Sequence, residues 1–308
     1  MLRYYVKKSY AEELQIVPTP AFEHTWVYGA STTDAELAQV VDDYSLDENI
    51  VHDVNDKHEL PRVEYTGDAL YVFASTPQKS LHGSIVSVPF LSVLKGSVLI
   101  TLAKTEYFTP EDVFDHAKMS LKSSHHVFVQ VLNRVIKQYE DQIHRSGTYI
   151  LNTRQRLKSR EVDNKDFIEF VTVEGDLNEY KTRLSALLVV FERLHENRHK
   201  SFTSKDCELI EDIILHVNQL LVAVASHTQT INSIRNAYTT ITNNTLNRRM
   251  KTLTLLTVLI TLPNVFYGMY GMNVALPFAE QEWAYLGIIG FTVILVVAVY
   301  MIVHRLKF

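Results

Sequence analysis

Cysteine is almost absent from this sequence, because Cys207 is the only one among 308 residues. One cysteine cannot build an internal disulfide framework, which favours a reducing compartment. The formal net charge of -5 is mild, so the chain also lacks the strongly basic balance that is typical of nucleic-acid binding. The N-terminal stretch Met1–Lys8 contains no apolar signal-peptide core. We therefore expect no nucleic-acid partner and no cleaved export signal.

Charged side chains are missing from two long stretches near the C-terminus. The segments Thr252–Ala279 and Trp283–Val303 contain no Asp, Glu, Lys or Arg. Within the first, Leu253–Tyr270 alone has 18 residues, and a helix rising about 1.5 Å per residue over that length approaches the roughly 30 Å hydrocarbon core of a bilayer. The sequence therefore predicts a membrane protein that ends in a hairpin of two transmembrane helices.

One face of the first predicted span is polar. Positions spaced alternately by three and four residues share a helix face, and here they are Asn247, Met250, Thr254, Thr257, Thr261, Asn264 and Gly268. The threonines could bond back to their own helix carbonyls, and Asn264 could bond to a neighbouring helix. An unbroken stripe favours a water-lined path instead, because polar residues inside a membrane are usually functional. Two helices cannot enclose a pore, so the path requires a cyclic homo-oligomer.

Flanking charges predict the orientation of the hairpin. Basic residues precede the first span (Arg248, Arg249, Lys251) and follow the second (His304, Arg305, Lys307), whereas the loop between the spans contains Glu280 and Glu282. The positive-inside rule then places both termini in the cytoplasm and the loop outside. We expect a multi-pass protein of the plasma (inner) membrane. The two glutamates would concentrate divalent cations at the mouth of an oligomer, although an exposed loop that is acidic by chance is an equal alternative.

Proline is missing between Pro110 and Pro263, whereas six of the eight prolines lie in the first 110 residues. The proline-rich part contains the strand-like runs Thr25–Tyr28, Val63–Tyr65, Leu70–Phe73, Ile85–Val88 and Val98–Thr101. Gly67 and Gly96 fit hairpin turns between strands, and Thr33 fits the cap of a helix. The proline-free part predicts long helices, in which Gly147 and Gly175 are candidate bends or helix ends.

These patterns predict an α+β membrane protein with an N-terminal cytoplasmic α/β domain, a long helical stalk and the transmembrane hairpin. The expected boundaries are 1–110 for the α/β domain, 111–203 for a cytoplasmic helical region, 204–250 for the stalk helix, 251–272 for the pore helix, 273–282 for the external loop, 283–303 for the second span and 304–308 for a basic tail.

The motif that closes the first span resembles that of a known family. Tyr270-Gly271-Met272-Asn273 is similar to the signature of CorA family magnesium transport proteins, and its place at the outer end of the penultimate span fits that family. Further short matches are Thr25-Trp26, Asp53, Pro61-Arg62-Val63-Glu64 and Met250-Lys251. The sequence departs from the family after the asparagine, where it has Leu276-Pro277-Phe278-Ala279-Glu280.

This resemblance implies a homopentamer that takes up Mg²⁺ passively and is not an enzyme. It implies a selectivity filter at Tyr270, Gly271, Met272 and Asn273, in which asparagine oxygens bond the water shell of the ion. It also implies a regulatory Mg²⁺ held between subunits by Asp53 and Asp212, with Glu211 close by. Mg²⁺ would then be both the transported and the regulatory ion, and Met250 and Leu253 could form a hydrophobic gate.

Two other functions stay open. The chain could carry another divalent cation such as zinc, cobalt or nickel, although Met272 favours magnesium, since relatives that move zinc tend to vary this position. The segment His195-Glu196-Asn197-Arg198-His199 matches the zinc-protease pattern of two histidines one helical turn apart. No third ligand is evident, so a membrane-anchored metalloprotease using His195 and His199 is the less favoured alternative.

Overall fold

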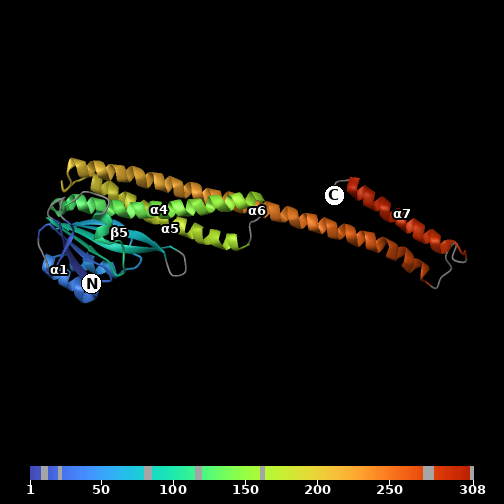
Figure 1. Cartoon of the computed structure of the whole chain (residues 1–308), viewed down its shortest axis with the longest axis horizontal. Helices are drawn as coiled ribbons and strands as arrows, with labels where there is room; N and C mark the ends of the chain where they lie inside the picture. The colour runs from blue at the N-terminus through green and yellow to red at the C-terminus, as the bar shows by residue number, and fades with distance from the viewer. Residues whose placement is uncertain are drawn as a thin grey trace. The chain divides into compact units, whose positions relative to one another are not determined.

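The structure is a computed structural model that describes residues 1–7, 13–19, 23–79, 85–114, 120–159, 164–272 and 281–305. The chain forms two compact units, Met1–Ile234 and Arg235–Phe308. The first unit contains the whole sheet and most of the helices (Figure 1). The second unit consists of the end of one long helix and a final helix.

A seven-stranded sheet is the centre of the first unit, with strand order β2-β1-β3-β7-β6-β5-β4. The strands are β1 (Leu2–Val6), β2 (Gln15–Val17), β3 (Thr25–Gly29), β4 (Arg62–Thr66), β5 (Ala69–Lys79), β6 (Ile85–Lys95) and β7 (Val98–Leu102). Strands β3 and β7 are parallel, and all other neighbours are antiparallel. Gly67 and Gly96 have φ of 62° and 54° in the turns after β4 and β6, a conformation that glycine adopts without steric cost.

Helices cover both faces of this sheet, because apolar side chains alternate along its strands. On one face, Val27 and Ile100 pack with helices α1 (Asp34–Tyr44) and α2 (Glu48–His52). On the other face, Trp26 and Leu99 pack with the long helices, and Figure 1 shows α1 and α4 on opposite sides of the strands. The remaining elements of the first unit are η1 (Asp53–Asn55), α3 (Pro110–Phe114), η2 (Leu121–Ser123), α4 (Ser124–Ser159) and α5 (Asn164–His195).

The predicted strands are all present, and β5 and β6 extend to 11 residues each. Strands β1 and β2 were not predicted, because β1 is continuous with the polar N-terminal stretch. The cap at Thr33 is confirmed as a capping box, in which the Glu36 N–H donates to Thr33 Oγ1 at 3.2 Å.

The interpretation of Gly147 and Gly175 as bends or helix ends is wrong. Both lie inside continuous helices, Gly147 in α4 and Gly175 in α5. A Cβ on Gly147 would lie 2.7 Å from the His227 ring of α6, so this glycine permits two helices to approach closely.

The last two helices are α6 (Ser204–Tyr270) and α7 (Ala284–Arg305). Buried residues of α6 in the first unit follow a three–four spacing and join the core; they are Ile210, Ile213, Val217, Leu220, Val224, Ile231 and Ile234. Among the described residues, α6 and α7 are both long and apolar enough to cross a membrane, and at most 6% of either apolar window is buried within the chain. Pro263 lies inside α6 without ending it.

Candidate ion pathway

Helix α7 covers one face of α6 within the second unit. The half-buried side chains of α6 there are Leu255, Leu259, Leu262, Pro263 and Phe266. Phe266 meets Phe291 of α7 edge to face with 5.2 Å between ring centroids, and the Tyr267 hydroxyl lies 3.2 Å from Thr292 Oγ1. Side chains on an α-helix advance by about 100° per residue, so these residues define a single contact face.

The polar stripe lies on the opposite face of α6. Its members are all exposed in the single chain: Asn247, Met250, Thr254, Thr257, Thr261, Asn264 and Gly268. The same 100° advance places this set roughly half a turn from the face that α7 covers. The second span therefore does not seal the stripe, which is exposed in the single chain.

The threonine hydroxyls of the stripe bond back to their own helix. Thr254 donates to the Met250 carbonyl at 2.9 Å, and Thr261 donates to the Thr257 carbonyl at 2.8 Å. Thr257 donates to the Leu253 carbonyl at 2.9 Å. Each hydroxyl thereby uses its hydrogen internally, which leaves the oxygen as an acceptor. Water bound to a metal ion directs its hydrogens outward, so an acceptor lining suits a hydrated cation.

The proposed gate residues are Met250, a member of this stripe, and Leu253, which lies beside it. Met250 and Leu253 are 53% and 57% exposed. A cavity of about 640 Å³ lies beside Asn247, Met250 and Thr254 and extends to Val303 of α7. Polar and apolar side chains thus meet at the start of the predicted span.

The predicted filter is only partly described. Tyr270 is the last residue of α6, and the next N–H groups continue the helical turn: Gly271 donates to the Tyr267 carbonyl at 3.0 Å and Met272 to the Met269 carbonyl at 3.2 Å. Asn273 and Glu280 lie outside the described residues. Glu282 is exposed just before α7.

The predicted regulatory residue Asp53 is already paired within its own chain. Arg62 Nη2 donates to Asp53 Oδ2 at 2.7 Å, and Arg62 Nε donates to Glu64 Oε1 at 2.6 Å. Arg62 Nη1 also pairs with Glu59. One guanidinium therefore neutralises part of a cluster of three carboxylates, and any metal ion bound by Asp53 would compete with it. The sequence analysis noted Arg62 as part of a motif but did not predict this pairing.

Glu211 and Asp212 are exposed on α6 in the first unit. Among the described residues, no group of three or more His, Cys, Asp or Glu could hold a metal ion within one chain. A regulatory site built from Asp53 and Asp212 would thus need the neighbouring subunit that the prediction assumes.

The start of α6 is anchored by a buried acid that the sequence analysis missed. Asp206 is 3% exposed; it accepts hydrogen bonds from the Thr203 hydroxyl at 2.7 Å and lies 2.9 Å from His126 Nδ1 of α4. Burial opposes ionisation, but these hydrogen bonds outweigh it and lower the pKa of Asp206. The Thr-x-x-Asp spacing before an apolar run was the signal in the sequence.

The zinc-protease alternative is wrong. Helix α5 ends at His195, and Asn197 has a positive φ of 45°, so His195 and His199 do not share a helix face. The His199 ring stacks on Tyr65 with 4.0 Å between centroids, and Asn197 Nδ2 donates to the Phe202 carbonyl at 2.8 Å. This segment is a structured turn between α5 and α6.

An α/β unit followed by two exposed apolar helices, one with a polar stripe, is the organisation expected of a membrane transport protein. The sequence profile of the family described as CorA-like Mg²⁺ transporter protein matches residues 23–305. Since this match spans most of the sequence, the chain belongs to the CorA family. It is a divalent-cation transporter and not an enzyme.

Relatives of known structure share the whole architecture. The cobalt/magnesium transport protein CorA of Methanocaldococcus jannaschii is 23% identical over 259 residues, which cover 81% of this chain and 80% of that protein. The complete structure of the CorA magnesium transporter from that organism matches with a TM-score of 0.83 at 17% identity and covers 99% of this chain and 98% of that one. The full-length CmaX protein matches with a TM-score of 0.74 at 14% identity, covering 99% and 97%.

Proposed function

We propose that this chain conducts Mg²⁺ along a path lined by the α6 stripe, with one copy of the stripe contributed by each subunit of a cyclic homo-oligomer, a pentamer. The observation that carries the proposal is the exposure of the stripe on the face of α6 opposite α7. A polar face that the chain's own second span leaves uncovered needs water or neighbouring copies around it. A path on the symmetry axis provides both.

The chemistry of the stripe fits a hydrated Mg²⁺ ion. Mg²⁺ loses its water shell reluctantly, so the lining must accept hydrogen bonds from bound water. Thr254, Thr257 and Thr261 present hydroxyl oxygens whose hydrogens are already used. A ring of Asn273 side-chain oxygens at the outer end would select the ion by the size of its water shell. Moving two charges inward gains about 4.6 kcal/mol per 100 mV, from about 2.3 kcal/mol for each charge, so no chemical fuel is needed.

The experiment is Mg²⁺ uptake into vesicles containing the purified protein. Asn273→Ala should abolish uptake, and undiminished selective flux in that variant would refute the filter. Thr257→Val removes a stripe acceptor and should reduce flux several-fold. Thr252→Val is the matched control, because Thr252 also bonds back to its helix but lies outside the stripe.

Regulation by internal Mg²⁺ is the second part of the proposal. Asp53 of one subunit and Asp212 of its neighbour, with Glu211 close by, would hold an Mg²⁺ ion that keeps the path shut, because facing carboxylates repel without a cation between them. Asp212→Asn should then conduct at an internal Mg²⁺ concentration that closes the unmodified protein. Glu208→Gln, another exposed acid of α6, is the control. Equal Mg²⁺ dependence in all three proteins would exclude this site.

The proposed location is the plasma membrane with both termini in the cytoplasm. Cys207 is partly exposed in the first unit and is the only cysteine of the chain. A membrane-impermeant maleimide should therefore label Cys207 only after the cytoplasmic side is opened. Labelling of intact cells would reverse the orientation.

Another divalent cation is the alternative cargo. The relative from Methanocaldococcus jannaschii is named a cobalt/magnesium transport protein, which favours cobalt over zinc or nickel as the competitor. Flux of each ion measured alone and in competition would decide, and Co²⁺ uptake that exceeds Mg²⁺ uptake at equal concentration would replace the magnesium assignment.

A further inference from the structure

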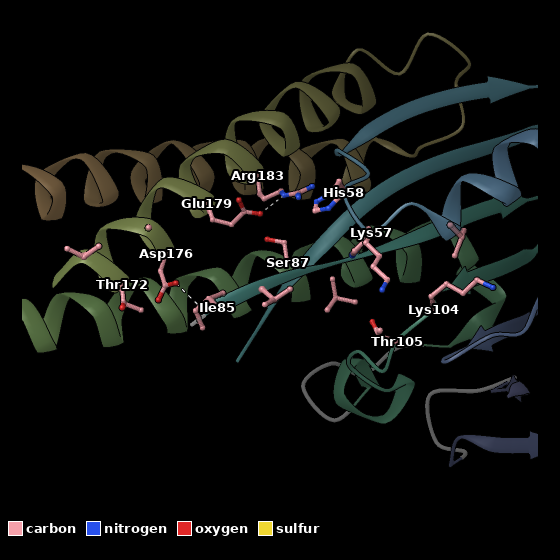
Figure 2. A pocket seen from close by; sticks show the side chains of 16 residues that line it. Lys57, His58, Ile85, Ser87, Lys104, Thr105, Thr172, Asp176, Glu179 and Arg183 are labelled. Atoms are coloured by element: carbon pink, nitrogen blue, oxygen red, sulfur yellow. Dashed lines mark hydrogen bonds and ion pairs between the residues drawn. The ribbon is translucent and has the colours of Figure 1, made fainter. Parts of the chain in front are cut away.

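The first unit contains a cavity of about 870 Å³ that the ion pathway does not use. Figure 2 shows its walls: one face of α5, the start of β6, the segment after η1 and the segment after β7. Apolar side chains supply much of the lining, among them Val54, Val88, Pro89 and Val171. A volume of this size lies within the range of small-molecule sites.

Several polar groups of the cavity are already paired. Asp176 Oδ1 accepts from the Ile85 N–H at 3.0 Å, and Figure 2 draws this bond beside the pair formed by Glu179 and Arg183. Arg183 Nε lies 2.9 Å from Glu179 Oε1, so both charges of that pair are compensated. The charge of Glu179 is therefore compensated by Arg183, and one oxygen of Asp176 is occupied by the Ile85 N–H.

Three polar groups remain for a ligand. Lys57 and His58 are exposed at one side of the cavity, and Lys57 makes no ion pair within the described residues. Ser87 is 7% exposed; its hydroxyl lies close enough to Tyr139 and Glu179 to interact with both, but neither contact has normal hydrogen-bond geometry. A buried hydroxyl with such weak contacts gains free energy when a ligand or water completes its hydrogen bonding. The cavity thus combines a side with Lys57 and His58, a weakly bonded hydroxyl and an apolar wall.

Gly175 leaves the α5 wall open. A Cβ built on this residue would meet no atom within 4 Å, and the neighbouring Val171 is 66% exposed. A glycine inside a helix is less stable than an alanine, and no close packing contact within the described residues explains it here. The missing side chain keeps free volume next to the apolar lining.

We propose that this cavity binds a small amphipathic organic anion, a carboxylate or a monophosphate ester on an apolar body. Lys57 and His58 bind the acidic group, Ser87 donates a hydrogen bond to the ligand, and the body lies against Val88 and Val171 beside Gly175. A nucleoside triphosphate does not fit this chemistry, because the described lining has no glycine-rich phosphate loop and no Phe, Tyr or Trp on which a base could stack. The assignment is independent of which metal ion the chain transports.

The test measures, by saturation-transfer NMR, the binding of small probes to the full-length protein in lipid nanodiscs. The anionic probes are 2-naphthoate, octanoate and phenyl phosphate, which distinguish carboxylates from phosphate esters. The comparison probes are the neutral 2-naphthamide and the cationic 2-naphthylmethylammonium. We expect saturable binding of at least one anionic probe, with at least tenfold weaker binding of the neutral and cationic compounds.

Two variants locate the site. Gly175→Leu fills the cavity from the helix and should weaken binding at least tenfold, whereas Asn178→Leu, which adds the same side chain at an exposed position of α5 outside the lining, should not. Lys57→Gln combined with His58→Gln should weaken the anionic probes and leave 2-naphthamide unchanged. Equal affinity in the Gly175→Leu and Asn178→Leu proteins would overturn the proposal. Tighter binding of the ammonium probe, or no saturable binding of any anion, would overturn it as well.

Discussion

The two units of this chain bury their apolar side chains in different ways. The first unit builds two hydrophobic clusters, one on each face of its sheet, with Trp26, Leu99 and Ile100 fully buried. In the second unit, Thr292 is the only buried residue among the described positions, although most of its side chains are apolar. The first unit is therefore stabilised by its own core, whereas the second requires a bilayer or further copies of the chain around it.

This contrast teaches that the same residue type has different consequences in the two units. A leucine in the first unit excludes water by contacting other parts of the chain. A leucine on the exposed face of α6 or α7 contacts lipid when the two helices are packed together, and it contacts lipid equally when they are inserted but not yet packed. Packing therefore transfers this side chain out of lipid hardly at all and gains little free energy from it. A substitution of an apolar residue should therefore change the free energy of unfolding more in the first unit than in the second.

The largest expected effect is that of a core truncation in the first unit. Leu99→Ala should lower the free energy of unfolding by about 2–5 kcal/mol, because Leu99 is fully buried in β7. Leu253→Ala, at a 57% exposed position of α6, should leave unfolding almost unchanged and alter Mg²⁺ flux instead. Denaturant unfolding in nanodiscs and vesicle flux measure the two effects, and equal destabilisation by both substitutions would break the comparison between the units.

A smaller effect is expected at the anchored start of α6. Asp206→Ala should cost about 0.5–2 kcal/mol at neutral pH, the range for a lost helix cap. The pKa of Asp206 is lowered from its ordinary value of 3.8, so the ionised form stabilises the fold above about that pH, and the contribution is lost as the pH falls through the lower folded value. The deficit of the variant should accordingly shrink below about pH 4.

Unfolding curves at several pH values test this anchor, with Glu208→Ala as the control because Glu208 is an exposed acid near the same helix end. The control should differ little from the unmodified protein at every pH. A deficit of Asp206→Ala that is the same at pH 3 and pH 7 would contradict the role of the ionised carboxylate.

The smallest effects are expected at the two helical glycines of the first unit. Gly175→Ala should raise the free energy of unfolding by about 0.5–1 kcal/mol, because alanine favours a helix and the position is open. Gly147→Ala should gain less or lose stability, since its Cβ must displace the His227 ring from a distance of 2.7 Å. Thermal midpoints of the two variants measured side by side give the sign of the difference, and an equal gain would show that His227 moves aside freely.

Local patterns in the sequence predicted the elements that depend on local physics. The strands from β3 to β7 followed from alternating and β-branched residues, and the helix cap at Thr33 followed from a threonine directly before the helix. Glycine between two strand-like runs predicted the hairpin turns at Gly67 and Gly96. The roles of Gly147 and Gly175 were not predictable, because they depend on what lies opposite each glycine in space.

The sequence by itself determined that this chain has two candidate membrane spans and that one face of the first is polar, because charge, hydrophobicity and helical period are properties of neighbouring residues. Only the tertiary structure decided that α7 packs on the face of α6 away from that stripe, that Arg62 pairs with Asp53, and that a cavity opens beside Gly175. These contacts join residues that are far apart in the chain. Each residue type could contact many partners, and the way in which whole helices and strands pack decides which partner it meets.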